Sequence, residues 1–148
     1  MYVLLGIVCA VLGVVALVAV IGARLPVDHL AASRARYAAD IDAVWPAVEA
    51  EIAAQETKVE IVERDAPRRL MTRIPPGGPF GGTWTLELAS QEKGTALTIT
   101  ERGEVYNAIF RFLSRFVFGH HGTQEQFLRA VGTRLHETAI PERLPTPP

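Results

Sequence analysis

Hydrophobic residues are distributed unevenly along this chain. Residues 2–23 form a continuous apolar run without a charge or a proline, whereas the later residues alternate apolar and polar positions in short periods. A helix needs roughly 20 apolar residues to cross the hydrocarbon core of a bilayer, which is about 30 Å thick. The run therefore predicts one transmembrane helix, and the chain is expected to be a single-pass membrane protein with a small domain attached.

An uncleaved anchor is favoured over a secretory signal. Such a signal has a basic start, an apolar stretch of about 7–15 residues and a cleavage site with small residues. Here no Lys or Arg precedes the run, and the bulky Ile21 lies where a small residue is needed. Arg24, Arg34 and Arg36 follow the run. Because positive charge tends to stay on the cytoplasmic side, the domain is expected to face the cytoplasm.

Beyond the anchor, alternation with a period of two predicts strands at residues 29–38, 58–64, 69–74, 83–89 and 95–105. This alternation is typical of a sheet with one face on the core and the other in solvent. Gly103 lies inside the last predicted strand and suggests a bulge or bend. Residues 75–82 are rich in Pro and Gly, which predicts a loop.

Three other segments repeat apolar positions at intervals of three and four, which predicts helices at residues 40–55, 108–118 and 124–137. Asp40 and Asn107 are suitable N-caps for the first two helices. Pro46 lies beyond the first turn and is expected to kink or restart the first helix. Gly132 lowers the helix propensity of the last one, and close approach to the sheet would explain it.

The order of elements predicts an α+β fold, in which an antiparallel sheet packs on a C-terminal helix. The chain divides into a transmembrane anchor (residues 2–23), one domain (residues 29–137) and a tail (residues 138–148). The tail is rich in proline and is expected to be disordered. The formal net charge is −1, so bulk charge does not predict nucleic acid as a partner. One cysteine excludes an internal disulfide framework.

Six segments in a fixed order carry a resemblance to a known family: residues 32–37, 41–45, 66–70, 79–85, 98–101 and 110–120. Together they resemble bacterial members of the SRPBCC (START-like, polyketide cyclase/dehydrase-like) superfamily over about residues 29–137. The resemblance implies a helix-grip fold, in which a curved antiparallel sheet holds a long C-terminal helix. It also implies binding of a lipid or another hydrophobic small molecule between sheet and helix.

The chain departs from this superfamily between the first predicted helix and the turn at residues 66–70. Members usually have several dozen residues there, which form a second short helix and two strands. Here only residues 46–65 occupy the interval. The shortening is expected to remove strands from one side of the sheet and to leave the rest contiguous. It would open a ligand cavity or expose a sheet edge that needs a partner.

The candidate cavity-lining residues are apolar side chains expected on the inner face of the sheet and on the helices: Tyr37, Trp45, Trp84, Leu86, Leu97, Phe112, Phe116 and Phe127. Hardly any titratable side chain accompanies them. We therefore expect no catalytic residue, no metal and no cofactor.

Two polar groups were weighed as chemical sites. His120-His121 and Glu125 have the helical spacing of a metal pair, but the sequence supplies no third ligand, so a polar connection between two helices is favoured. Glu101 and Glu104 are three positions apart and would point to opposite faces of a regular strand. Solvated charges are therefore favoured over an acid/base pair.

The segment at residues 109–118 holds four of the six phenylalanines together with Arg111 and Arg115. A core helix with an outer face that carries the arginines is the favoured interpretation. The alternative is a helix at the membrane interface or at the mouth of a lipid pocket, with the aromatic side chains buried and the arginines reaching phosphates.

Three functions fit these observations. The favoured one is a membrane-tethered binding module for a lipid or other hydrophobic small molecule, with the bilayer as partner and without catalysis. The first alternative is a structural or protein-binding module without a pocket, which uses the exposed sheet edge. A homodimer would form through that edge or through the small residues Gly6, Ala10 and Gly13 of the anchor. The second alternative is an enzyme of the cyclase/dehydrase type.

Overall fold

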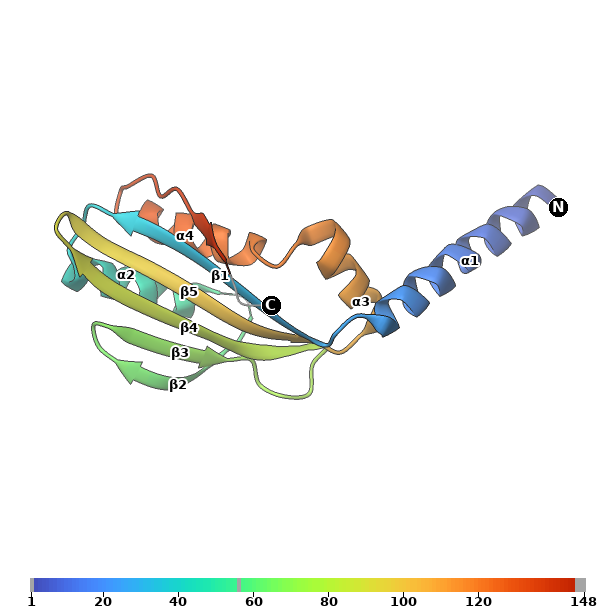
Figure 1. Ribbon diagram of the computed structural model, residues 1–148, viewed down its shortest axis with the longest axis horizontal. Coiled ribbons are helices and arrows are strands. Elements are labelled where there is room, and N and C mark those ends of the chain that lie inside the picture. The colour runs from blue at the N-terminus through green and yellow to red at the C-terminus, as the bar shows by residue number, and fades with distance from the viewer. Residues whose placement is uncertain (1, 56, 146–148) are drawn as a thin grey trace.

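Figure 1 presents the computed structural model of the protein, which describes residues 2–55 and 57–145. The elements, in chain order, are α1 (Tyr2–Arg24), β1 (Asp28–Tyr37), α2 (Ile41–Ala54), β2 (Glu60–Asp65), β3 (Arg69–Arg73), β4 (Phe80–Gln91), β5 (Gly94–Val105), α3 (Ala108–Leu113), the π-helical turn η1 (Ser114–Phe118), α4 (Gly122–Arg134) and β6 (Glu142–Leu144).

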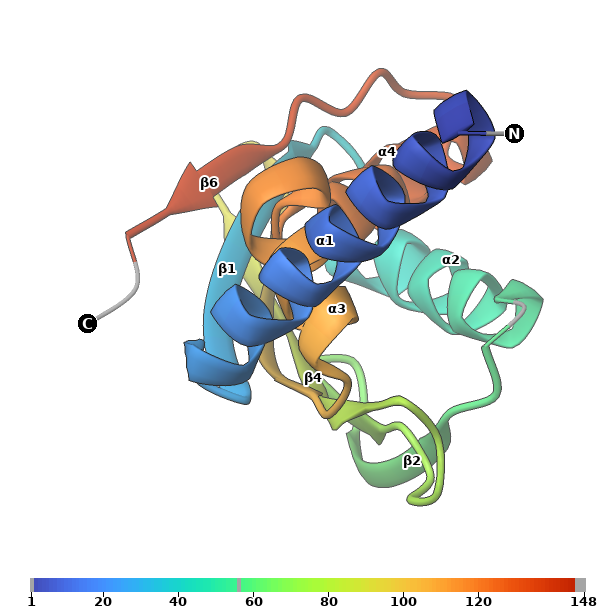
Figure 2. The same ribbon diagram turned by 90° about the vertical axis from the view of Figure 1, so that its right-hand side faces the viewer.

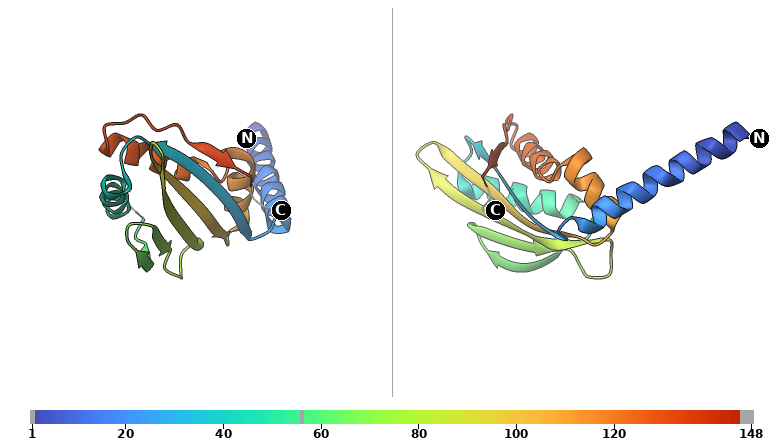
Figure 3. Two further views of the ribbon diagram at one scale, coloured as in Figure 1. Left: turned by 60° about the vertical axis from the view of Figure 1, so that its left-hand side comes forward. Right: turned by 45° about the vertical axis from the view of Figure 1, so that its right-hand side comes forward.

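The apolar run at the N-terminus forms α1, which projects from one end of the domain (Figures 1 and 3). Its side chains are exposed from Tyr2 to Leu17. The helix is long and apolar enough to cross a membrane. The helix predicted at residues 2–23 is thereby confirmed.

The strands form one antiparallel sheet in the order β2-β3-β4-β5-β1-β6. The first strand therefore lies beside the last long strand. The register of β5 is continuous through Gly103 against both neighbouring strands, so the bulge expected there is wrong. The absence of a side chain at Gly103 instead leaves room for the ring of His29. The sheet has its register shift in β2, between Ile61 and Glu63.

Helices α2 and α4 cover the same face of the sheet (Figures 2 and 3). The backbone N–H of Ala43 donates to the Asp40 carboxylate at 2.9 Å, so Asp40 caps α2 as predicted. Helix α2 is continuous through Pro46 rather than restarted there. Alternate strand residues and the inner stripes of both helices are buried together, among them Val44, Val48, Leu70, Leu86, Leu97, Ile99, Leu128 and Val131. The predicted α+β architecture is confirmed.

Two expectations about the C-terminal region are wrong. Within the tail, which was expected to be disordered, Glu142–Leu144 forms β6 and pairs with β1. Arg143 also bonds to Glu125 of α4 at 2.6 Å, and this contact lowers the pKa of the Glu125 carboxyl. Gly132 lies against Ala139 and the carbonyl of Glu137, and not against the sheet. The rest of the tail, residues 146–148, lies outside the described residues.

The connection after α2 leads directly to one edge of the sheet. The remaining strands are contiguous, and β2 forms one edge with all six of its residues exposed. The other edge is β6, which covers part of β1. The β2 edge lies where α2 ends and the chain returns to the sheet.

Candidate ligand-binding pocket

The structure brings six of the eight predicted cavity-lining residues together, in the packed core. Tyr37, Trp45, Leu86, Leu97 and Phe127 are buried, and Trp84 is half-buried against them. The ring of Phe127 meets that of Trp84 edge-on, with 5.7 Å between centroids. These side chains occupy the space between sheet and α4, where the family resemblance implied a ligand.

Tyr37 fastens α4 to the sheet at the centre of this core. Its hydroxyl donates to the backbone carbonyl of Leu128 at 2.8 Å. Burial raises the pKa of the Tyr37 phenol well above its usual range, and the nearby Glu137 carboxylate raises it further. That carboxylate accepts from the backbone N–H groups of Ala38 and Ala39 at 2.7 and 2.9 Å. Tyr37 is thus a neutral structural donor.

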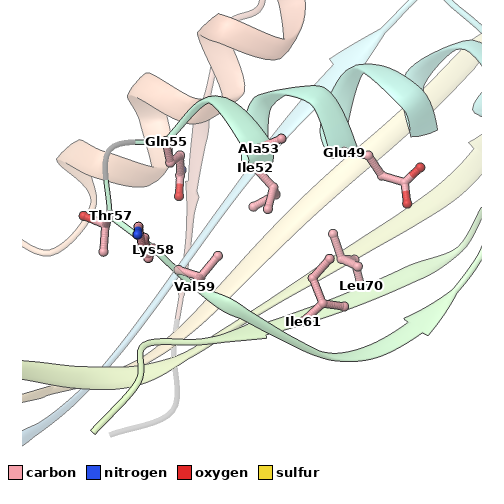
Figure 4. Close-up of a pocket in the computed structure, with 9 residues that line it drawn as sticks. All are labelled: Glu49, Ile52, Ala53, Gln55, Thr57, Lys58, Val59, Ile61 and Leu70. Carbon is pink, nitrogen blue, oxygen red and sulfur yellow. The ribbon is translucent and has the colours of Figure 1, made fainter. Parts of the chain in front are cut away.

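A pocket lies beside this core, between the second half of α2, the segment after it and the β2–β3 hairpin (Figure 4). Its volume is about 380 Å³, which falls in the range of small-molecule sites. Its apolar lining comes from Ile52 and Ala53 on one side and from Val59, Ile61 and Leu70 on the other. Ile52 and Leu70 are buried, whereas Ile61 is 55% exposed, so the pocket opens toward the β2 edge.

The polar lining residues lie at the two ends of the pocket. Gln55, Thr57 and Lys58 gather where α2 ends, while Glu49 lies on the preceding turns of the helix (Figure 4). Glu49 accepts a hydrogen bond from Arg64 of β2 at 2.6 Å. Lys58 is exposed at the other end. The arrangement suits an apolar body with one polar end.

None of the eight predicted residues lines this pocket. The sequence does hold a signal for it, because apolar positions at Ile52, Val59 and Leu70 flank the shortened connection. Periodicity places these side chains on faces but gives no distance between the elements. Their role as ligand contacts, like that of the eight predicted residues, stays a hypothesis.

A cluster of polar side chains closes the other end of the core, beneath the start of α4. Imidazole Nε2 of His29 lies 3.2 Å from Glu101 Oε1, and the His29 ring stacks on His120 with centroids 3.9 Å apart. The amide of Gln124 donates to Glu101 Oε2 at 3.1 Å and to the carbonyl of Ala31 at 3.2 Å. Burial lowers the pKa of His120, and the positive potential of His29 lowers it further.

The two groups weighed as chemical sites are separated by this geometry. His121 lies 3.2 Å from the hydroxyl of Ser33, and Glu125 is bonded to Arg129 and Arg143. Glu101 belongs to the partly buried cluster with His29 and Gln124, whereas Glu104 accepts from the hydroxyl of Tyr106. Across residues 2–55 and 57–145, no group of three His, Cys, Asp or Glu side chains is placed to hold a metal ion.

Phe112 and Phe116 lie apart from the other six predicted residues. They belong to α3 and η1, where their rings are 4.9 Å apart, and Phe116 is 60% exposed. Helix α3 packs against α1, and η1 packs against α3. The favoured interpretation of residues 109–118 as a core helix is therefore wrong, because no residue of α3 is buried.

Comparison with protein-family models and with curated proteins gives no match. Solved structures do match. A conserved protein from Geobacillus kaustophilus is 12% identical, with 77% of this chain and 99% of that one covered and a TM-score of 0.60. CalU16 from Micromonospora echinospora is 19% identical, with 75% and 84% covered and a TM-score of 0.52. The polyketide cyclase-like protein Cgl2372 from Corynebacterium glutamicum is 16% identical, with 76% and 86% covered and a TM-score of 0.41.

At such identities, similarity extends to the fold alone. The two structures with TM-scores above 0.5 share the arrangement described above over three quarters of this chain. The first strand lies beside the last long strand, and a helix near the C-terminus crosses the sheet. The chain therefore has the α+β fold that its sequence predicted, an antiparallel sheet packed on a C-terminal helix, and it shares this fold with the two solved structures.

Proposed function

We propose that this protein is a membrane-tethered module that binds a lipid or other apolar small molecule in the pocket between α2 and the β2–β3 hairpin. The observation that carries the proposal is the pocket itself. It is largely apolar and it opens at the β2 edge of the sheet, and the resemblance to the SRPBCC superfamily implies binding of an apolar ligand. Helix α1 would hold the domain beside the source of such ligands, on the cytoplasmic side of the membrane.

Binding without catalysis is favoured by the composition of the pocket. Its charged residues are Glu49 and Lys58, and Glu49 is already engaged by Arg64. A cyclase or dehydrase would need a positioned acid or base within hydrogen-bond reach of its substrate. An apolar lining with the ammonium group of Lys58 at the mouth suits an amphiphile with an anionic end.

The β2 edge does not favour the alternative of a module that binds partners by strand addition. Edge strands are protected from pairing when they are short, bulged and charged. Strand β2 has six residues and a register shift, and it carries Glu60, Glu63 and Arg64. Each of these charged side chains also forms an ion pair with another residue of the domain.

The test is photo-crosslinking of the full-length protein in liposomes with a fatty acid that carries a diazirine on its chain. The variant Ala53→Phe places a ring in the pocket, and Ala50→Phe is its matched control, because Ala50 is exposed on the same helix but does not line the pocket. We expect crosslinked peptides from residues 52–70 in the wild type and in Ala50→Phe, and their loss in Ala53→Phe.

Labelling of α1 by bulk lipid provides the internal standard and is expected to be equal in all three proteins. Equal labelling of residues 52–70 in Ala53→Phe would overturn the proposed pocket. Absence of that labelling in the wild type, with α1 labelled normally, would overturn it as well.

A further inference from the structure

A second apolar surface lies at the other end of the domain, beside the base of α1. It consists of exposed side chains from the start of β4, the end of β5, α3 and η1: Phe80, Tyr106, Phe110, Phe116 and Val117. We call this surface the platform. The rings of Phe80 and Phe110 are stacked with centroids 5.4 Å apart, so the platform joins the edge of the sheet to α3.

The platform is fixed to α1 by direct contacts. Gly22 is buried against the backbone of Ala108, where a side chain larger than hydrogen would collide with the carbonyl. Arg111 donates to the carbonyl of Gly22 at 2.9 Å and to that of Val105 at 3.4 Å. The C-terminal end of α1 is therefore joined to the start of α3, and the two helices lie side by side there (Figure 2).

These contacts also set the depth of α3 relative to the apolar segment. Val18 and Ala19 are half-buried and Gly22 is buried, whereas the preceding residues of α1 are exposed. Helix α3 is the element in contact with α1, so it covers the last two turns. Val18 lies five residues before Ala23, the last residue of the apolar run. At a rise of 1.5 Å per residue, α3 therefore covers about 7 Å of the run, measured along the axis of α1. Helices that lie in a membrane interface are buried about 5–10 Å.

Charges around the platform suit the headgroup region. Arg24 in the last turn of α1 and Arg115 in η1 are exposed. Aromatic side chains with a polar tip, such as Tyr106, are enriched at the same depth in membrane proteins. Arginines beside an exposed apolar surface match the anionic phosphates above the acyl chains.

We propose that the platform inserts into the membrane interface and docks the domain against the bilayer, so that α1 and α3–η1 form one membrane-bound unit. The partner of the platform is the lipid surface, because the platform adjoins the exposed apolar helix α1. The inference rests on the tether in the proposed function but not on the pocket. In this arrangement α1 does not tether the domain loosely but holds it in a fixed position against the bilayer.

The test uses full-length protein in liposomes of phosphatidylcholine with phosphatidylglycerol, some of which carry a brominated acyl chain as quencher. Cys9 is the sole cysteine, so Cys9→Ala gives a background for single fluorescent labels. The labelled positions are Val117→Cys on the platform, Leu12→Cys within α1 and Lys93→Cys in the hairpin at the far end of the sheet. We expect quenching at positions 12 and 117 and none at position 93.

Two outcomes would overturn the inference, and they are distinguishable. In the first outcome, the label at position 12 is quenched but the labels at 117 and 93 are not. This result would leave the tether intact and exclude docking. A label at 12 that is not quenched would exclude the tether, and the docking with it. The photo-crosslinking of the pocket reports on neither.

A substitution on the platform adds a second readout. Phe116→Ser in the Val117→Cys protein is expected to reduce quenching at 117. The matched control is Ile140→Ser, which removes an equally apolar side chain that is 82% exposed and lies outside the platform. Both changes affect exposed residues, so thermal unfolding of the domain should be unchanged. Equal quenching in the two variants would contradict docking through the platform.

Discussion

The two apolar regions on the helix-covered face of the sheet differ in what fills them. Beneath α4, the rings of Tyr37, Trp84 and Phe127 close the space between helix and strands. Beneath the end of α2, the lining has no aromatic side chain, and a pocket of about 380 Å³ is left open. One sheet thus supports both a filled core and an open pocket, and the volume of a few side chains decides which of the two forms.

The difference has a physical cause in the length of the chain. The connection from α2 to β2 is short, so β2 and β3 form the sheet edge with no further strand or helix outside them. Apolar residues at an edge are covered from one side only, which leaves Ile61 exposed while Leu70 is buried. The closed region is covered by the sheet on one side and by helix on the other, and its side chains are buried there.

The largest effect is expected from removal of a ring in the closed region. Phe127→Ala deletes a buried side chain and leaves a cavity, which should lower the free energy of unfolding by about 3–5 kcal/mol. Ile61→Ala, at the mouth of the open pocket, should change it by less than about 0.5 kcal/mol. Denaturation of the full-length protein in detergent, followed by tryptophan fluorescence, measures both. Similar losses in the two variants would show that the regions do not differ in packing.

An intermediate effect is expected at Tyr37, which joins β1 to α4 across the closed region. Tyr37→Phe removes one hydrogen bond to the Leu128 carbonyl and should cost about 1 kcal/mol. Because burial raises the pKa of this phenol, the unfolded chain loses its proton first as pH rises above about 10. Stability should therefore fall with rising pH in the wild type, and less steeply in Tyr37→Phe.

Unfolding of the two proteins between pH 8 and pH 11 provides the measurement. The pocket variant Ala53→Phe is the control, since it keeps Tyr37 and should retain the wild-type slope. A slope unchanged in Tyr37→Phe would mean that other groups govern the alkaline loss of stability.

The residues of the closed region can be predicted from the sequence, because they recur with the period of a strand or a helix. Alternation placed Leu86 and Leu97 on the inner face of their strands, and helical spacing placed Trp45 and Phe127 on the inner sides of theirs. The sequence predicts that these side chains line a cavity, whereas in the structure they pack against one another in the core. The pattern gives the face but not the fit between side chains, and the rings are large enough to fill the space themselves.

The remaining features depend on long-range geometry. Strand β6 has three residues between two prolines, and an edge strand tolerates such neighbours because one of its sides needs no hydrogen bond. No residue type marks the π-helical turn η1 that follows α3, so the sequence predicts a single helix at residues 108–118. The burial of Gly22 depends on Ala108, which is far away in the sequence. The pocket depends on the distance between the end of α2 and the β2–β3 hairpin, which no local pattern records.

The smallest effect is expected from the polar end of the closed region, where His120 stacks on His29 above Glu101. Because burial and the neighbouring His29 lower the pKa of His120, the unfolded chain takes up its proton first as pH falls below about 6.5. The folded state therefore loses stability between pH 7 and pH 5, and His120→Asn should reduce that loss. The matched control is His136→Asn, which removes an exposed histidine outside the cluster and should keep the wild-type slope. Fatty-acid labelling of residues 52–70 should be insensitive to His120→Asn, because the pocket shares no residue with the cluster. A change in labelling would mean that the filled core and the open pocket are coupled through the sheet.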